Sequence, residues 1–346
     1  MYTFKRFFIL FLLALPGLAC SDGEQDYYIE QSHSEILNGV SYVGSRNEVG
    51  IEAFTPLQTI HSQWVALIPF GFIGADSPQL FFDIEWQWWG EKTEGILQNT
   101  KDARTAGQKI MLKPQVWIRD GAFTGDLNMQ TEAEWLILED SYSAYILHFA
   151  AVAEDINAEL FCIGTEFRNF VLKRPAFWTQ LISDVRKVYT GNLTYAANWD
   201  SYQQVPFWDK MEFIGVDAYF PLSAGKTPEV NTLKTSWDPI KAELKKFSVK
   251  NNKNILFTEY GYASRDFSTE KPWDSWRGKP VNLQAQANAY QAIFETFWSE
   301  EWFSGGFLWK WYSYNESAGG LEHAGYTPQN KPAQEIIKSQ YKLYAE

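Results

Sequence analysis

The chain has 346 residues, of which 45% are hydrophobic and 17% aromatic, so it can bury a large core and is not intrinsically disordered. Acidic residues outnumber basic residues by 42 to 30, and the resulting net charge of −12 argues against binding to nucleic acid or to anionic membranes. The 16 Trp and 18 Tyr residues are many for this length. Flat aromatic rings suit sugar rings, although most large aromatic side chains belong to cores.

The first 19 residues have the pattern of an export signal, with two basic residues before an apolar stretch. This stretch is too short to span a bilayer comfortably, so we expect a cleaved signal rather than a helical anchor. The residues before Cys20 resemble a bacterial lipobox, from which Gly17 and Leu18 depart. We therefore expect lipidation of Cys20 and export to the bacterial outer membrane or cell surface, with plain secretion as the alternative.

A polar segment, residues 20–34, is expected to act as a tether, and residues 35–346 are expected to form one catalytic domain. This part of the chain contains no evident repeat, low-complexity tract or second domain. After Cys20 the remaining cysteine is Cys162, which lies inside an apolar run. That position predicts a buried structural thiol rather than a nucleophile or a disulfide partner.

Strand-like runs alternate with longer amphipathic segments along the domain. Strands are expected at residues 37–43, 64–70, 109–118, 160–164, 193–198, 213–219, 255–258 and 306–311. The clearest helical patterns cover residues 93–106, 132–155, 175–189, 232–247, 283–299 and 331–344. Eight parallel strands joined by helical crossovers predict an α/β fold of the (β/α)8 TIM barrel type. The crossovers at 51–63 and 200–210 leave little room for full helices.

Two of the expected strands run into a glutamate: Glu166 follows the fourth strand and Glu259 follows the seventh. In an eight-stranded barrel these positions face each other across the mouth, where catalytic residues lie. A pair of carboxyl groups there suits a glycosidase, in which one protonates the leaving oxygen and the other attacks the anomeric carbon. Either glutamate alone would more simply be a structural hydrogen-bond acceptor, but the pair favours catalysis.

Three short motifs carry a resemblance to a known family. Gly164-Thr165-Glu166, Met111-Leu112-Lys113-Pro114 and Thr258-Glu259-Tyr260-Gly261 resemble glycoside hydrolase family 113, the family of endo-β-1,4-mannanases in clan A. The resemblance runs from about residue 39 to residue 311, and it departs from many clan A members, which have Asn before the acid/base. It implies a retaining (β/α)8 hydrolase in which Glu166 is the acid/base and Glu259 the nucleophile.

Polar and aromatic residues at the ends of neighbouring strands are candidates for substrate binding: Lys113, Trp117, Asn198, Trp199, Asp217, Tyr219 and Trp309. Tyr219 is a candidate to hydrogen-bond the nucleophile, and Trp309 to form the floor under the sugar. Each has an equally good interpretation as rim packing or a loop ion pair. The segment 85–90 is either an aromatic platform or a hydrophobic lid, and we expect one stacking Trp in it.

No cofactor and no metal are expected. The four histidines show no ligand spacing, and the chain has neither a Gly-x-Ser-x-Gly elbow nor a phosphate-binding Gly-rich loop. We expect a monomer whose partner is a polysaccharide or oligosaccharide. One alternative is a clan A hydrolase of another β-glycan, such as glucan or xylan. Another is a non-catalytic carbohydrate-binding surface lipoprotein, and a structural or adhesive surface protein is the simplest.

Overall fold

The computed structural model describes residues 36–345, apart from 75–76, 275–277 and 279. Residues 34–346 belong to one compact unit. The expected signal, the lipidation site at Cys20 and the whole of the expected tether lie outside the described residues. Within the described residues, none of the helices has the length and apolarity to cross a membrane.

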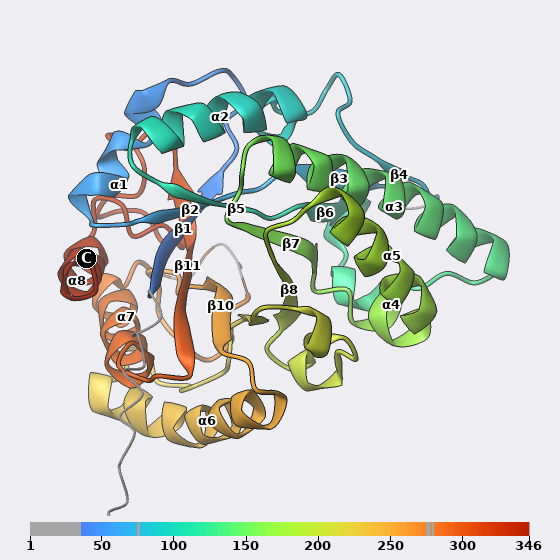
Figure 1. Cartoon of the computed structure of the whole chain (residues 1–346). Coiled ribbons are helices and arrows are strands. Elements are labelled where there is room, and N and C mark those ends of the chain that lie inside the picture. The colour runs from blue at the N-terminus through green and yellow to red at the C-terminus, as the bar shows by residue number, and fades with distance from the viewer. Residues whose placement is uncertain (1–35, 75–76, 275–277, 279, 346) are drawn as a thin grey trace, which may run out of the picture. The chain divides into compact units, whose positions relative to one another are not determined.

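Eight parallel strands close into a barrel in the centre of Figure 1. The first strand pairs with both the second and the last barrel strand, which closes the ring. The sequence-based prediction of a (β/α)8 barrel is therefore confirmed. In chain order the barrel strands are β1 (Leu37–Val43), β2 (Trp64–Leu67), β5 (Lys109–Leu112), β7 (Leu160–Thr165), β8 (Asn192–Asn198), β9 (Ile214–Asp217), β10 (Ile255–Tyr260) and β11 (Phe303–Tyr312).

Helices surround the barrel (Figure 1). They are α1 (Thr55–Thr59), α2 (Thr93–Thr105), α3 (Glu132–Asp155), α4 (Arg168–Lys173), α5 (Pro175–Val188), α6 (Val230–Asn251), α7 (Leu283–Phe297) and α8 (Pro332–Leu343). The six predicted helices are present, and the short α4 was not predicted. The two short crossovers hold only α1 and single 3-10 turns, as their lengths suggested.

Two predicted strands, 64–70 and 109–118, are each broken in two, which corrects the sequence-based boundaries. After β2 and β5, the chain continues as β3 (Phe70–Ile73) and β6 (Gln115–Ile118), which pair with each other and leave the barrel. With β4 (Leu80–Phe81) they form a separate three-stranded sheet in the order β4-β3-β6. Both breaks fall at a proline, Pro69 or Pro114, whose missing N–H interrupts a ladder of hydrogen bonds.

The three-stranded sheet lies against α3, the longest helix. Thr131 and Glu134 form a capping box at the start of this helix, with the Glu134 amide 3.2 Å from the Thr131 hydroxyl. The Tyr145 hydroxyl donates to the carbonyl oxygens of Pro69 and Gln115, 2.9 Å from each. These bonds fix the point at which the two strands leave the barrel.

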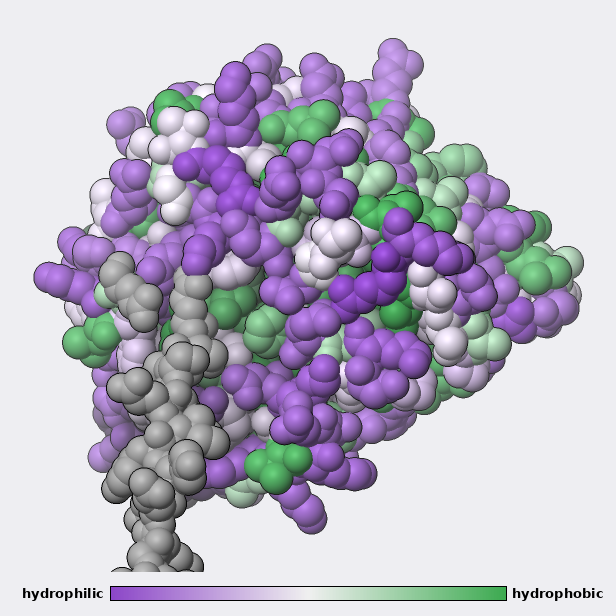
Figure 2. All heavy atoms as spheres, in the orientation of Figure 1, coloured by the Kyte–Doolittle hydropathy of each residue, from purple (hydrophilic) through white to green (hydrophobic). Residues whose placement is uncertain are grey.

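The interior of the barrel changes character along its axis. Its base is filled by apolar side chains: Leu37, Trp64, Ala66, Met111, Leu160, Leu256 and Phe307. Toward the carboxyl ends of the strands the buried side chains become polar and include Lys113, Asp217, Thr258 and Glu259. The outer surface in Figure 2 is mainly hydrophilic, with apolar side chains in small separate patches. The buried polar groups therefore gather at the end where barrel enzymes hold their chemistry.

Candidate active site

Glu259 lies in β10 at the carboxyl end of the barrel, and three side chains hold its carboxylate. Gln115 donates to Oε1 at 2.6 Å, and Lys113 donates to the same oxygen. Tyr219 donates to Oε2 at 2.8 Å, the contact suggested by its position after the sixth strand. Both oxygens of this carboxylate therefore accept hydrogen bonds, one of them from an ammonium group, and its orientation is fixed.

Lys113 and Asp217 form the next layer inside the barrel, and both are fully buried. The Lys113 ammonium lies 3.7 Å from Asp217 Oδ1, which also accepts from the Thr258 hydroxyl at 2.8 Å. Burial alone would lower the pKa of Lys113, but Asp217 and Glu259 together raise it above its usual range. Lys113 was predicted to bind substrate, and its burial and ion pairs support a role in holding Glu259.

Glu166 directly follows β7 and has a positive φ of 58°. This left-handed conformation is uncommon for residues other than glycine and is often found at functional sites. The Glu166 amide donates to the Ala196 carbonyl at 2.8 Å, and the Phe167 amide donates to the Tyr195 hydroxyl at 2.8 Å. Two bonds to the neighbouring strand β8 therefore hold the backbone at the carboxylate in this conformation.

The carboxyl groups of Glu166 and Asp217 have raised pKa values. Burial, followed by the charges of Asp217 and Glu259, raises the pKa of Glu166 well above its usual range. Burial and the Glu259 charge raise the pKa of Asp217 to about 7, against the effect of Lys113. Glu166 has no ion-pair partner among the described residues, whereas Glu259 has Lys113. The environments of the two glutamates thus differ, which favours a proton on Glu166.

Glycines in two of the motifs allow close packing around these glutamates. A Cβ on Gly164 would lie 2.7 Å from the Tyr142 hydroxyl and 2.9 Å from the Trp178 ring. A Cβ on Gly261 would lie 2.4 Å from the Trp309 carbonyl oxygen. Both positions exclude larger residues because neighbouring elements approach the backbone closely.

The other predicted binding residues occupy different parts of the mouth. Asn198 ends β8 and donates to Asp200 at 2.9 Å, and Trp199 stacks on Trp273 at 5.3 Å. Trp309 is partly exposed in β11, with the Lys310 ammonium 5.3 Å from its ring. Trp117 lies outside the barrel, in β6, and is 54% exposed.

Gln115 was missed by the sequence analysis. It sits two residues beyond Lys113, and its amide reaches Glu259 because the chain bends at Pro114. The signal available in the sequence was Pro114 itself, which is poorly tolerated within a central strand.

The most exposed aromatic side chains of the described residues share one end of the barrel. Each lies between the carboxyl end of a barrel strand and the next outer helix: Phe81, Trp86, Trp88, Trp117, Phe123, Phe267, Trp273 and Tyr314. The other exposed large hydrophobic side chains of the described residues are aliphatic. The exposed aromatic rings of the described residues are therefore concentrated around the mouth of the barrel.

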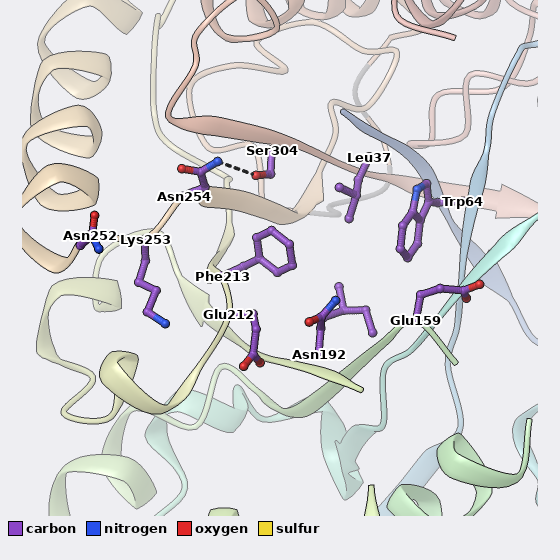
Figure 3. A pocket seen from close by; sticks show the side chains of 11 residues that line it. Leu37, Trp64, Glu159, Asn192, Glu212, Phe213, Asn252, Lys253, Asn254 and Ser304 are labelled. Carbon is purple, nitrogen blue, oxygen red and sulfur yellow. Dashed lines mark hydrogen bonds between the residues drawn. The ribbon is translucent and has the colours of Figure 1, made fainter. Parts of the chain in front are cut away.

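A hollow of about 500 Å³ lies at the opposite end of the barrel (Figure 3). Its apolar floor includes Leu37, Trp64 and Phe213, while Glu159 and Glu212 lie at its edge. Glu159 pairs with Arg104, and Glu212 pairs with Arg186 at 2.7 Å. With its carboxylates already paired, this hollow lacks the arrangement that distinguishes the mouth. In no part of the described chain do three or more His, Cys, Asp and Glu side chains form a group suited to a metal ion.

Known proteins resemble this chain in both sequence and structure. The model of glycoside hydrolase family 113 matches residues 45–331. No curated protein sequence matches the chain. The structure is similar to the family 113 β-mannanase from Alicyclobacillus acidocaldarius, solved in complex with ManMIm, with 27% sequence identity and a TM-score of 0.79. That similarity covers 90% of this chain and 98% of the mannanase.

Two further solved structures illustrate the range of similarity. A family 113 β-1,4-mannanase in a complex is 27% identical, with a TM-score of 0.75, over 89% of this chain and 99% of its own. A β-glucuronidase from Faecalibacterium prausnitzii is 10% identical, with a TM-score of 0.60, over 89% of this chain and 49% of its own. The second likeness concerns the barrel fold alone.

Proposed function

Because the chain belongs to glycoside hydrolase family 113, we propose that it is a β-mannanase that cleaves mannan or glucomannan with retention of configuration. The chain is a glycoside hydrolase, and the substrate and stereochemistry are the proposed part. Similarity to solved β-mannanases over nearly their whole length supports the substrate. The contrast between the two glutamates supports the mechanism.

In the first step of the proposed mechanism, a Glu259 oxygen attacks the anomeric carbon. The bond from that carbon to the glycosidic oxygen breaks, and Glu166 gives its proton to the leaving oxygen. In the second step water attacks the anomeric carbon, Glu166 takes a proton from the water, and the ester bond to Glu259 breaks. The carboxyl groups are expected to lie about 5–5.5 Å apart, the separation typical of retaining enzymes.

The observation that carries this proposal is the set of donors on Glu259. Lys113, Gln115 and Tyr219 all donate to it, so it is held as an oriented anion. Glu166 has a raised pKa and is suited to deliver a proton near neutral pH. An acid and an anionic nucleophile on one barrel mouth are the two groups that double displacement requires.

The test is hydrolysis of galactomannan, glucomannan, β-glucan and xylan by the mature protein, with products separated by length. We expect selective cleavage of the two mannans, and product sizes that distinguish endo from exo action. Glu166→Ala and Glu259→Ala should each lower kcat by at least about 10³-fold. Early ¹H NMR spectra of the products should show the β anomer first.

Each outcome of this test has a defined meaning. Preference for β-glucan or xylan would replace the substrate and keep the mechanism. Early appearance of the α anomer would overturn retention. Binding of polysaccharide with no hydrolysis of any substrate would contradict the proposal and favour a non-catalytic binding protein.

We also propose that the protein is exported and anchored through a lipid on Cys20, because an export signal and a lipobox-like segment precede this residue. Labelling of the bacterial cells with a palmitate analogue should mark the wild-type protein and not Cys20→Ser. Labelling of neither form, with the protein found in the medium, would favour plain secretion.

A further inference from the structure

A second aromatic surface lies outside the barrel, on the three-stranded sheet. It is a groove of about 570 Å³ between β3, β4, β6 and the segment after β4. Its aromatic lining consists of Phe72, Phe81, Trp86 and Trp117, and Arg119 adds a positive charge. We call this surface the aromatic groove. The side chains of Phe81, Trp86 and Trp117 are each at least half exposed, so three large rings here are only partly covered by protein.

The alternation of side chains along the strands builds this groove. Phe72 pairs in register with Trp117 on one side and with Phe81 on the other, so all three rings share one face of the sheet. The alternate residues Ile73, Leu80, Val116 and Ile118 are buried. The sheet therefore has a buried apolar face and an open face made of aromatic rings.

Trp86 is held in place beside these rings. Its ring meets Phe72 edge to face at a centroid distance of 4.8 Å. The next residue, Gln87, is buried and donates from its side chain to the Phe70 carbonyl at 2.9 Å and the Glu91 carbonyl at 3.0 Å. This anchor ties the segment that carries Trp86 to β3, so the wall of the groove is already formed in the free protein. A preformed aromatic wall binds a ligand with little loss of side-chain entropy.

The strand β6 connects the aromatic groove with the site around Glu259. Gln115 and Trp117 are alternate residues of β6, so their side chains leave the same face of the strand roughly 7 Å apart. Gln115 contacts the carboxylate of Glu259, and Trp117 lines the groove. A polymer bound at Glu259 and running along β6 would therefore meet the Trp117 ring next.

The chemistry of the groove fits a sugar chain better than an apolar protein segment. Stacking on flat rings requires a ligand with apolar faces, and the Arg119 guanidinium offers several N–H donors to hydroxyl groups at the ligand's edge. Among the residues that the structure describes, no acidic side chain lines the groove. Its rings also belong to the set of exposed aromatic residues gathered at the mouth.

We propose that the aromatic groove is a remote binding site for the polysaccharide chain, which stacks sugar units on Trp117 and Trp86 beyond the bond that is cleaved. This proposal rests on the proposed function, since it assumes a β-linked polysaccharide in the mouth. It assigns a role in holding long substrates to the sheet that leaves the barrel. A fragment confined to the sugars next to Glu259 would not reach this surface.

The test measures binding separately from hydrolysis. The full mature protein carrying Glu259→Gln is combined with Trp86→Ala, Trp117→Ala or both, and its retardation is measured in gels containing galactomannan or glucomannan. We expect each substitution to weaken binding about tenfold and the pair to weaken it further. Trp117→Phe should keep most of the affinity, whereas Trp117→Leu should not, because Leu keeps apolar surface without a flat ring.

Trp88→Ala is the matched control, because Trp88 is an exposed Trp in the same segment but does not line the groove. Equal retardation of the parent, Trp86→Ala and Trp117→Ala proteins would overturn the proposal. Full affinity in Trp117→Leu would also overturn it, as would a change of oligomeric state in the double variant without a change in retardation. Hydrolysis by the protein with Glu259 intact tests the proposed function, whereas retardation of the Glu259→Gln proteins tests the aromatic groove. Each proposal can therefore fail without the other.

Discussion

Both ends of the barrel carry carboxylates, but the carboxylates at the two ends differ in their ion-pair partners. At the base, Glu159 and Glu212 each pair with their own arginine at the edge of the hollow in Figure 3. At the mouth, Glu259 and Asp217 share one buried lysine, Lys113, and Glu166 forms no ion pair with the described residues. Charge is nearly balanced at the base and is left in excess at the mouth.

This difference explains where the pKa values move. Carboxylates that are crowded together and buried raise each other's pKa. Glu166 and Asp217 show this effect at the mouth. An excess of buried negative charge costs stability and favours the protonated form of one carboxyl group.

Replacing Lys113 with Met should have the largest effect. It would leave Glu259 and Asp217 buried without their cation, which should lower the free energy of unfolding by about 3–5 kcal/mol. Hydrolysis should also fall by roughly 10²–10³-fold, measured as kcat on the preferred glycan. Lys109→Met is the matched control, because Lys109 lies at the base end of the same strand, beside Trp64. A Lys113→Met enzyme as stable and active as the Lys109→Met enzyme would show that the carboxylates of the mouth do not depend on their shared lysine.

Lys331 links two loops of the mouth, and its buried ammonium group should make the stability of the protein depend on pH. Its ammonium donates to the Ser264 hydroxyl at 2.8 Å and the Gly325 carbonyl at 2.9 Å and lies 3.2 Å from His323 Nδ1, so it has no anionic partner in these contacts. Burial lowers the pKa of Lys331 to about 7. Between that value and the usual 10.5 the unfolded chain binds more protons than the folded one, so stability should rise with pH in this window.

The measurement for Lys331 is denaturant unfolding at pH 6, 8 and 10. As the pH rises through this window, the free energy of unfolding of the wild-type protein should increase by roughly 2–4 kcal/mol relative to that of Lys331→Met. Below about pH 7 the folded and unfolded chains both carry the proton on Lys331, so no difference is expected there. Lys342→Met, on the exposed side of α8, should follow the wild-type pH dependence. Parallel curves for wild type and Lys331→Met would contradict the prediction.

Asp217→Asn should move the pH profile of hydrolysis. The charge of Asp217 helps to raise the pKa of Glu166, so its removal should lower that pKa. A general acid is active only while protonated, and the basic limb of kcat/KM should therefore shift to lower pH, by about 0.5–1 unit. An unchanged basic limb would show that the Asp217 charge does not act on the acid.

Glu212→Gln at the base should have the smallest effect. The variant loses its ion pair with Arg186, and because these side chains are about one-third exposed the cost should stay near 1 kcal/mol. Hydrolysis should remain within about twofold of wild type. A loss of tenfold or more would mean that the hollow at the base takes part in activity.

The barrel and the positions of the two glutamates at its mouth could be predicted because local signals encode them. Strand and helix periods give the alternation of elements, and a glutamate after an apolar strand is visible within a few residues. Contacts across the barrel are not encoded in this way. Lys113 was predicted to reach the substrate, and nothing local to it shows that its ammonium meets Glu259 far along the chain.

The breaks within two of the strands were also not predicted from the sequence. An apolar run such as 109–118 reads as one long strand unless Pro114 is given weight. The same applies to 64–70 and Pro69. The three-stranded sheet, the position of Gln115 and the outward placement of Trp117 all follow from these two bends.

The bend at Pro114 places two roles within a six-residue segment. Lys113 and Gln115 contact Glu259, and Trp117 lines the aromatic groove. Residues 113–118 therefore form one cassette that combines the contacts to the Glu259 carboxylate with the proposed contact to the polymer. Exchange of this cassette between related enzymes should alter chain-length preference as a unit, whereas grafting Trp117 alone would give a ring without the bend that aims it.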